Sequence, residues 1–154
     1  MKIELDDLSR PAIHALLEEH MRHMHSLGPP ESVHALDLDR LRAPGITFWS
    51  VWDGETLLGC GALSQLDPRH GEVKSMRTPE AQRGRGAGRA LLMHIIDVAR
   101  GRGYERLSLE TGSVAAFVPA HRLYESAGFM RSVPFASYVE DVNSVFMTLV
   151  LPKV

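Results

Sequence analysis

A glycine-rich turn at residues 83–89 (RGRGAGR) constrains the fold more than any other segment. The preceding residues 71–77 (GEVKSMR) have the character of a strand, and the apolar residues after the turn recur at helical spacing up to Gly101. Small residues let the backbone approach a ligand closely, and unpaired amides at a helix start attract an anion. The segment therefore predicts a strand–turn–helix unit that binds phosphate. The turn consists of Arg83, Gly84, Arg85, Gly86, Ala87, Gly88 and Arg89, and its three arginines add forked donors suited to phosphate oxygens.

Three phosphate-binding patterns compete for this turn. The nucleoside triphosphate loop requires Gly-Lys followed by Ser or Thr, which the turn lacks. The dinucleotide fingerprint requires Gly-x-Gly-x-x-Gly, and Gly84, Gly86 and Gly88 do not have that spacing. The third pattern, Gln/Arg-x-x-Gly-x-Gly/Ala, is met by Arg83, Gly86 and Gly88. Taken alone this motif is short, and a flexible basic loop that caps a helix is the alternative.

The composition restricts what else the chain can do. Its 154 residues favour one domain, and a formal net charge of -2 gives no general attraction to nucleic acid or to an anionic membrane. Cys60 is the only cysteine, which excludes an intrachain disulfide, and its apolar surroundings in the sequence predict a core residue. The N-terminal residues lack the apolar stretch of a signal peptide, and no apolar run is long enough to span a membrane. We therefore expect a cytoplasmic protein.

The order of predicted elements is mixed α+β around one sheet. Asp53-Gly54 is a strong hairpin signal between two strand-forming segments, and Gly128 has the usual position of a glycine that ends a helix. The predicted strands cover residues 1–5, 46–52, 56–64, 71–77, 104–111 and 145–151. The predicted helices cover a segment from Ser9 to Gly28, residues 36–41, the segment from the glycine turn to Gly101, and residues 115–127.

A second motif follows the strand at 104–111. Residues 120–129 (AHRLYESAGF) carry the pattern Ala-x-x-Leu-Tyr-x-x-x-Gly-Phe on a predicted helix. With both motifs present at this separation, residues 71–129 resemble the GNAT superfamily of N-acetyltransferases. The resemblance implies one GNAT-fold domain over residues 1–154, with a mixed, mostly antiparallel sheet of about seven strands flanked by helices. It also implies that the fourth and fifth strands are parallel and splay apart.

The resemblance further implies how a coenzyme would be held. Acetyl-coenzyme A would lie between the splayed strands, with its pantetheine arm along the backbone near Met76 and Arg77 and its pyrophosphate on the amides of residues 84–88. An amine would attack the thioester directly, and a backbone amide near Met76 would stabilise the oxyanion. Tyr124 would protonate the leaving thiolate, which a tyrosine with an ordinary pKa of about 10 can do. A purely structural Tyr124, packed beside its neighbours, is the alternative.

One position departs from the family pattern. Phe117 stands seven residues before Tyr124, where an asparagine often contacts the pantetheine in the family. At Phe117 some coenzyme contact is therefore expected to be lost or replaced by apolar packing.

The residues that handle the acceptor are less constrained. Glu72, early on the fourth strand, is the expected general base, with Glu110, His70 or a chain of waters as alternatives. The residues expected to bind the acceptor are His34, Glu110, Phe135 and Tyr138.

The expected reaction is acetyl transfer to the primary amine of a small molecule or peptide. The N-terminal histidines, His20 and His23 among them, lack the cysteine or carboxylate partners that would complete a metal site, so no metal is expected. Small enzymes of this family often dimerise, so a homodimer is one expected state. The alternative from another class is a non-catalytic acyl-coenzyme A-binding module, against which Tyr124 argues.

Overall fold

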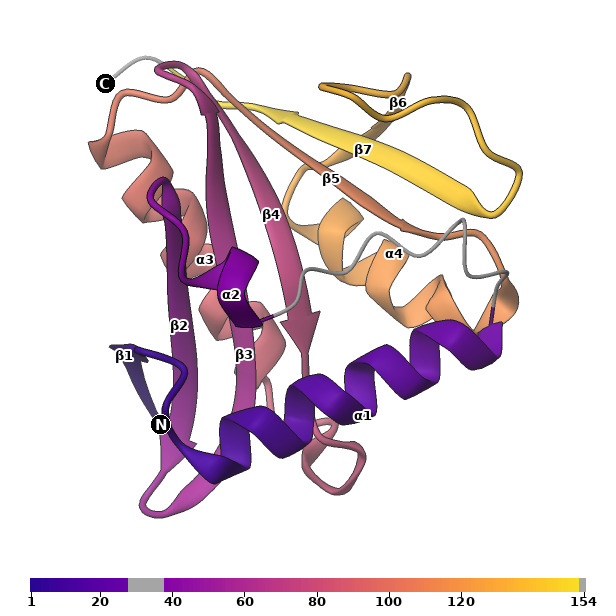
Figure 1. Cartoon of the computed structure of the whole chain (residues 1–154). Coiled ribbons are helices and arrows are strands. Elements are labelled where there is room, and N and C mark those ends of the chain that lie inside the picture. The colour runs from indigo at the N-terminus through magenta and orange to yellow at the C-terminus, as the bar shows by residue number, and fades with distance from the viewer. Residues whose placement is uncertain (28–37, 153–154) are drawn as a thin grey trace.

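The computed structural model describes residues 1–27 and 38–152, in which seven strands form one sheet (Figure 1). The strands are β1 (Lys2–Leu5), β2 (Ile46–Asp53), β3 (Thr56–Asp67), β4 (His70–Arg77), β5 (Arg106–Gly112), β6 (Met130–Ser132) and β7 (Ser144–Val150). The helices are α1 (Pro11–Leu27), α2 (Leu38–Leu41), α3 (Ala87–Gly101) and α4 (Val118–Ser126), with short 3-10 turns η2 (Glu80–Gln82) and η3 (Ala115–Phe117). The strand order β1-β2-β3-β4-β5-β7-β6 brings β4 and β5 together at the centre.

The central pair of strands is the parallel one, and it separates. β4 and β5 pair at His70–Arg106, Gly71–Leu107 and Glu72–Ser108, whereas the other neighbouring strands of the described sheet are antiparallel. Beyond Glu72 the two strands diverge, as Figure 1 shows. The predicted α+β class, the mostly antiparallel sheet and the splay of its fourth and fifth strands are all confirmed.

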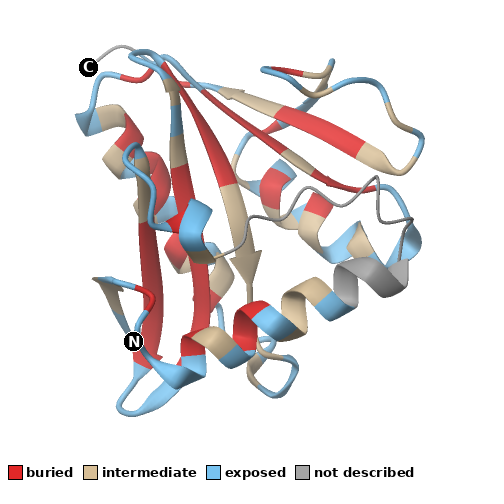
Figure 2. Cartoon of the chain, viewed as in Figure 1, coloured by how far each residue is buried: buried red, intermediate tan, exposed pale blue. Residues whose placement is uncertain are grey.

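Helices cover both faces of the sheet. The apolar stripe of α3 is fully buried against the strands, in one cluster with residues of α4 (Figures 1 and 2). α1 crosses the opposite face, where Ile13 and Leu16 pack with Cys60 and Ala62 of β3. Cys60 is a core residue, as expected, and burial raises the pKa of its thiol to about 12, so that the thiol stays protonated.

β4 contains a β-bulge at Ser75, whose backbone is left-handed with a φ of 55°. Cys60 of β3 faces Arg77 and Ala62 faces Lys74, so three steps along β4 match two along β3. An extra residue of this kind shifts the alternation of side chains by one. Arg77 therefore lies on the same face of the sheet as Lys74, the face that α1 covers.

The structure differs from the predicted elements in a few places. The edge strand β6 has only three residues, too short for an alternating pattern to be read from the sequence. The predicted helix over 115–127 is divided into η3 and α4, because Pro119 cannot donate a hydrogen bond and fits only the first turn of a helix. The fifth strand begins at Arg106, because the Tyr104 amide donates to the carbonyl of Ala99 at the end of α3. Among the described residues no helix is long and apolar enough to cross a membrane.

Close packing at Gly71 of β4 generates a stability prediction. A methyl group there would lie 2.7 Å from the ring of Tyr104 and 2.9 Å from Leu63, both buried. Gly71→Ala should lower the free energy of unfolding by about 1–3 kcal/mol, because neither neighbour can move without overpacking the core. Chemical denaturation measures this change. The matched control is Gly101→Ala at the end of α3, where no atom lies within 4 Å of the added methyl group. An equal loss in both variants would contradict the prediction.

Candidate active site

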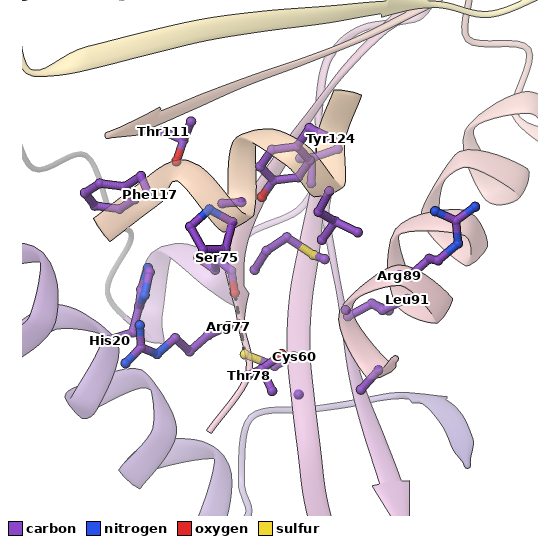
Figure 3. Close-up of a pocket in the computed structure, with 18 of the residues that line it drawn as sticks. His20, Cys60, Ser75, Arg77, Thr78, Arg89, Leu91, Thr111, Phe117 and Tyr124 are labelled. Carbon is purple, nitrogen blue, oxygen red and sulfur yellow. Dashed lines mark hydrogen bonds between the residues drawn. The ribbon is translucent and has the colours of Figure 1, made fainter. Parts of the chain in front are cut away.

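A cavity of about 490 Å³ opens where β4 and β5 separate. Its walls come from β4, from the glycine turn before α3, from η3 and α4, from two residues each of β3 and β5, and from single residues of α1 and the segment after β6 (Figure 3). All the residues expected to contact the coenzyme line this cavity: Met76, Arg77, Arg83, Gly84, Arg85, Gly86, Ala87, Gly88, Arg89 and Phe117. The splay thus places segments from both motifs around one space.

The glycine turn leaves backbone donors open to the cavity. Gly84 and Gly86 have left-handed backbones, with φ of 82° and 83°, and an added Cβ at either would meet no atom of the described residues within 4 Å. Gly86 is the N-cap of α3, and no side chain caps this end of the helix. The first amides of a helix without a side-chain cap are donors for an anion, and the helix dipole adds to the attraction.

The arginines of the turn do not all face an open site. Arg85 forms an ion pair with Asp53 at 2.6 Å and donates to Gln82, and Arg89 donates to the hydroxyl of Ser126 at 3.0 Å. Arg83 is exposed at the rim of the cavity. Two of the three arginines therefore help to fix the turn and the start of α3, in addition to adding positive charge.

Tyr124 lies on α4 with its ring in the core and its hydroxyl facing the cavity (Figure 3). Its ring packs edge-on against Phe129 with the centroids 5.8 Å apart. Gly128 adopts a φ of 101°, and the amide of Phe129 donates back to the carbonyl of Tyr124, so this helix end fixes the ring pair. No described residue makes a hydrogen bond with the Tyr124 hydroxyl. Burial raises the pKa of Tyr124 to about 12, so the hydroxyl carries its proton at neutral pH.

Phe117 forms an apolar part of the wall. Its ring lies directly against the backbone of Gly112 at the end of β5, where no side chain would fit. Figure 3 shows the ring at the η3 end of the cavity, away from Tyr124. Phe117 therefore presents an apolar ring to the cavity, and its contact with the coenzyme stays a prediction.

Glu72 is buried in a small polar cluster where β4 and β5 begin to separate. Its Oε2 accepts from the Lys74 ammonium at 2.9 Å and from the Tyr138 hydroxyl at 2.6 Å, and Lys74 lies 3.0 Å from that hydroxyl. Burial, and then the negative charge of Glu72, raise the pKa of Tyr138, which therefore acts as a hydrogen-bond donor. Lys74 was not among the expected site residues. Lys74 follows Glu72 by two residues on one strand, and this spacing is the signal that places both side chains on the same face.

The other expected acceptor and base residues lie in different positions. Glu110 lines the cavity and accepts from the hydroxyl of Ser144 at 2.7 Å. Phe135 lies behind Tyr138, with ring centroids 5.0 Å apart, and supports that ring without lining the cavity. His70 is outside the cavity wall, where it bonds to Ser108 at 2.6 Å, and burial lowers its pKa. His34 lies outside the described residues.

Two basic side chains lie on the α1 side of the cavity. His20 of α1 lines it, and Figure 3 shows Arg77 extending from β4 toward His20. The Arg77 side chain is only 10% exposed and pairs with Glu19 at 2.9 Å. Its position here depends on the bulge at Ser75, which no motif in the sequence reveals. Within the described part of the chain, no group of three His, Cys, Asp or Glu side chains could hold a metal ion.

Comparisons with known proteins identify the class. Residues 12–129 match the model of the acetyltransferase (GNAT) family. The uncharacterized N-acetyltransferase YsnE of Bacillus subtilis (strain 168) is 57% identical over 148 residues, covering 96% of this chain and 98% of YsnE. The uncharacterized N-acetyltransferase YedL of Escherichia coli (strain K12) is 50% identical over 97% of this chain and 94% of its own length. The crystal structure of a Bacillus subtilis acetyltransferase in complex with CoA shares the fold, with a TM-score of 0.71 at 19% identity over 98% of this chain and 99% of that one.

The chain therefore belongs to the GNAT acetyltransferase family. The prediction of an acetyl-coenzyme A-dependent N-acetyltransferase is confirmed at the level of enzyme class.

The open backbone at Gly86 generates a binding prediction. Gly86→Asp places a carboxylate beside the unpaired amides, so coenzyme A affinity should fall by more than about tenfold, through repulsion and blocked donors. Isothermal titration calorimetry measures the affinity. The matched control is Gly45→Asp, because Gly45 has a φ of 88°, has the same open space around it and lies away from the cavity. Both variants should lose similar stability, and unchanged affinity in Gly86→Asp would contradict the placement of the pyrophosphate.

Proposed function

We propose that this chain transfers an acetyl group from acetyl-coenzyme A to the primary amine of a small molecule by direct attack. The observation that supports the proposal is a single cavity that joins the glycine turn, the splay of β4 and β5, and the Tyr124 hydroxyl. In this proposal residues 1–154 act as one catalytic unit.

The splay provides the place for the coenzyme. Past Glu72, β4 has no strand partner on the β5 side among the described residues, so its backbone near Met76 and Arg77 is available to the amides of a pantetheine arm. The pyrophosphate would then lie on the amides of residues 84–88, at the start of α3. Phe117 would pack against the apolar part of the arm.

The bulge provides an oxyanion donor. Neither Ser75 nor Met76 has a partner in the register between β3 and β4, and a bulge leaves backbone groups outside the ladder. As the amine attacks the carbonyl carbon, negative charge develops on the thioester oxygen, and a free amide near Met76 would stabilise it. The carbon–sulfur bond then breaks, which leaves an amide product and a thiolate.

Tyr124 would give its proton to that thiolate. Ordinary pKa values are near 10 for a tyrosine and near 8.5 for a thiol. The tyrosine is the weaker acid, so the proton transfer is slightly uphill in water. Burial disfavours both anions, so the pKa of the thiol in the same cavity is raised along with that of Tyr124. With a pKa of about 12, Tyr124 stays protonated, so its ionisation should cause no loss of activity at any pH below about 11.

Glu72 would accept the proton that the acceptor amine loses. Its carboxylate lines the cavity, and hydrogen bonds from Lys74 and Tyr138 fix its orientation. Those two donors also share its negative charge, so Glu110 and a chain of waters stay as alternative bases. His70 does not line the cavity, which removes the reason for proposing it.

Loss of the Tyr124 hydroxyl tests the acid role. Tyr124→Phe keeps the packing on Phe129 and removes only the donor, so kcat should fall by about a hundredfold or more. Coenzyme A affinity should hardly change, because the interaction matters mainly as the thiolate forms. The matched control is Tyr104→Phe, which removes a buried hydroxyl that bonds to Gln65 outside the cavity. Near-normal kcat in Tyr124→Phe, with chemistry shown to be rate-limiting, would exclude the acid role.

The pH profile of Glu72→Gln tests the base. In the wild type, kcat/KM should rise with pH through the neutral range, because the acceptor must lose its proton before it attacks. Glu72→Gln should lower kcat/KM and change the profile. Its melting curve is needed as well, because loss of one partner of a buried ion pair costs about 3–5 kcal/mol.

Two further variants complete this test. The double variant Glu72→Gln with Lys74→Met removes both charges and should recover stability without recovering the rate. The matched carboxylate variant is Glu110→Gln. A normal profile in Glu72→Gln, together with an altered one in Glu110→Gln, would transfer the role to Glu110.

A further inference from the structure

We propose that the acceptor is an amino acid or a similarly small zwitterion, and that its carboxylate is bound by Arg77 and Lys74. The inference rests on the proposed acetyl transfer and names the acceptor class for the same cavity. It assigns a role to the Arg77 side chain, which the proposed reaction does not use, and a further role to Lys74, which also orients Glu72.

The bulge at Ser75 brings both cations to one wall of the cavity. On a regular strand, residues 74 and 77 would point to opposite faces. The register, with Arg77 facing Cys60 and Lys74 facing Ala62, puts them on the same face. Their ion pairs agree, because Lys74 contacts Glu72 on that face and Arg77 contacts Glu19 of α1.

Arg77 has a buried donor that nothing in the described chain uses. Its side chain is 10% exposed, one terminal nitrogen pairs with Glu19 at 2.9 Å, and its Nε is buried without a hydrogen-bond partner. A guanidinium presents its donors as a planar fork that fits a carboxylate with two parallel hydrogen bonds. An unused buried donor is costly unless a ligand supplies the acceptor. A carboxylate in the cavity would pair with this guanidinium, and a small rotation of the group would bring Nε to it.

Lys74 can contribute a donor beside it. The Lys74 side chain is 11% exposed. Its ammonium bonds to Glu72 and Tyr138, which uses two of its three donors. The third donor is therefore available on the wall that Arg77 shares.

The coenzyme does not account for these cations. Its phosphates belong at the glycine turn, where the helix start and three other arginines lie. The pantetheine arm that would run past Arg77 has amides but no charge. A buried guanidinium and an ammonium on this side of the cavity therefore fit an anion of the acceptor.

The cavity also holds the opposite charge. Glu72 and Glu110 line it and can receive the ammonium of the acceptor before it loses its proton. Both signs of charge in one small cavity match a molecule that carries both. A polyamine would bring a second cation toward Arg77 and Lys74, and a peptide N-terminus would bring an uncharged amide there, so both are disfavoured.

Matched acceptor pairs test the inference. Thiol release from acetyl-coenzyme A is followed with amino acids, with their carboxamides and with polyamines, and kcat/KM is expressed per unprotonated amine. The kcat/KM of the best amino acid should exceed that of its own carboxamide by about a hundredfold or more, because the amide leaves the cationic donors unpaired. Equal or better rates with carboxamides or polyamines would overturn the inference and leave the acetyl transfer standing. If none of the acceptors gives thiol release although coenzyme A binds normally, both the acceptor class and the acetyl transfer are overturned.

Variants of the two cations separate recognition from structure. Arg77→Gln and Lys74→Met should each raise KM for the amino acid by about tenfold or more and change KM for its carboxamide much less. A purely structural role would affect both acceptors equally, and that result would overturn the assignment. The matched control is Arg106→Gln, because Arg106 is exposed and contacts His70 outside the cavity. It should leave both KM values unchanged.

Discussion

Two parallel strands that separate after three paired residues are the constraint on which the candidate site depends. The pairing of β4 with β5 stops at Glu72, and the bulge at Ser75 then takes the β4 backbone out of register with β3 as well. A strand in the middle of a sheet normally has both of its edges paired. Here the unpaired backbone is exposed in a cavity, where a ligand with amides of its own can replace the missing strand.

The same distortion organises charge in the cavity. At one end, positive potential comes from local features, because backbone amides at the start of α3 need only a glycine turn to expose them. On the β4 wall, Glu72 and Lys74 share the α1 face by simple alternation, and the bulge adds Arg77 to the same face. The glycine turn suits phosphate, and the β4 wall suits a ligand with charges of both signs.

Much of the fold could be predicted because its signals are local. The apolar stripe of α3, the hairpin at Asp53-Gly54 and the glycine after α4 each predicted an element that the structure contains. The short edge strand β6 escaped prediction, since three residues carry no measurable alternation. For the site, the glycine turn and Tyr124 were found from their motifs, whereas Lys74 and the side chain of Arg77 were not, and Phe135 proved to lie behind Tyr138.

The sequence by itself determined which segment forms the glycine turn and which helix carries the tyrosine, because backbone conformation at glycines and helical periodicity are set by neighbouring residues. Only the tertiary structure decided which side chains share the cavity. The partners of Glu72 and Arg77 are Tyr138 and Glu19, which are 66 and 58 residues away along the chain. Such contacts depend on how β4 parts from β5 and on one extra residue in its register, and both follow from packing of the whole sheet rather than from any local pattern.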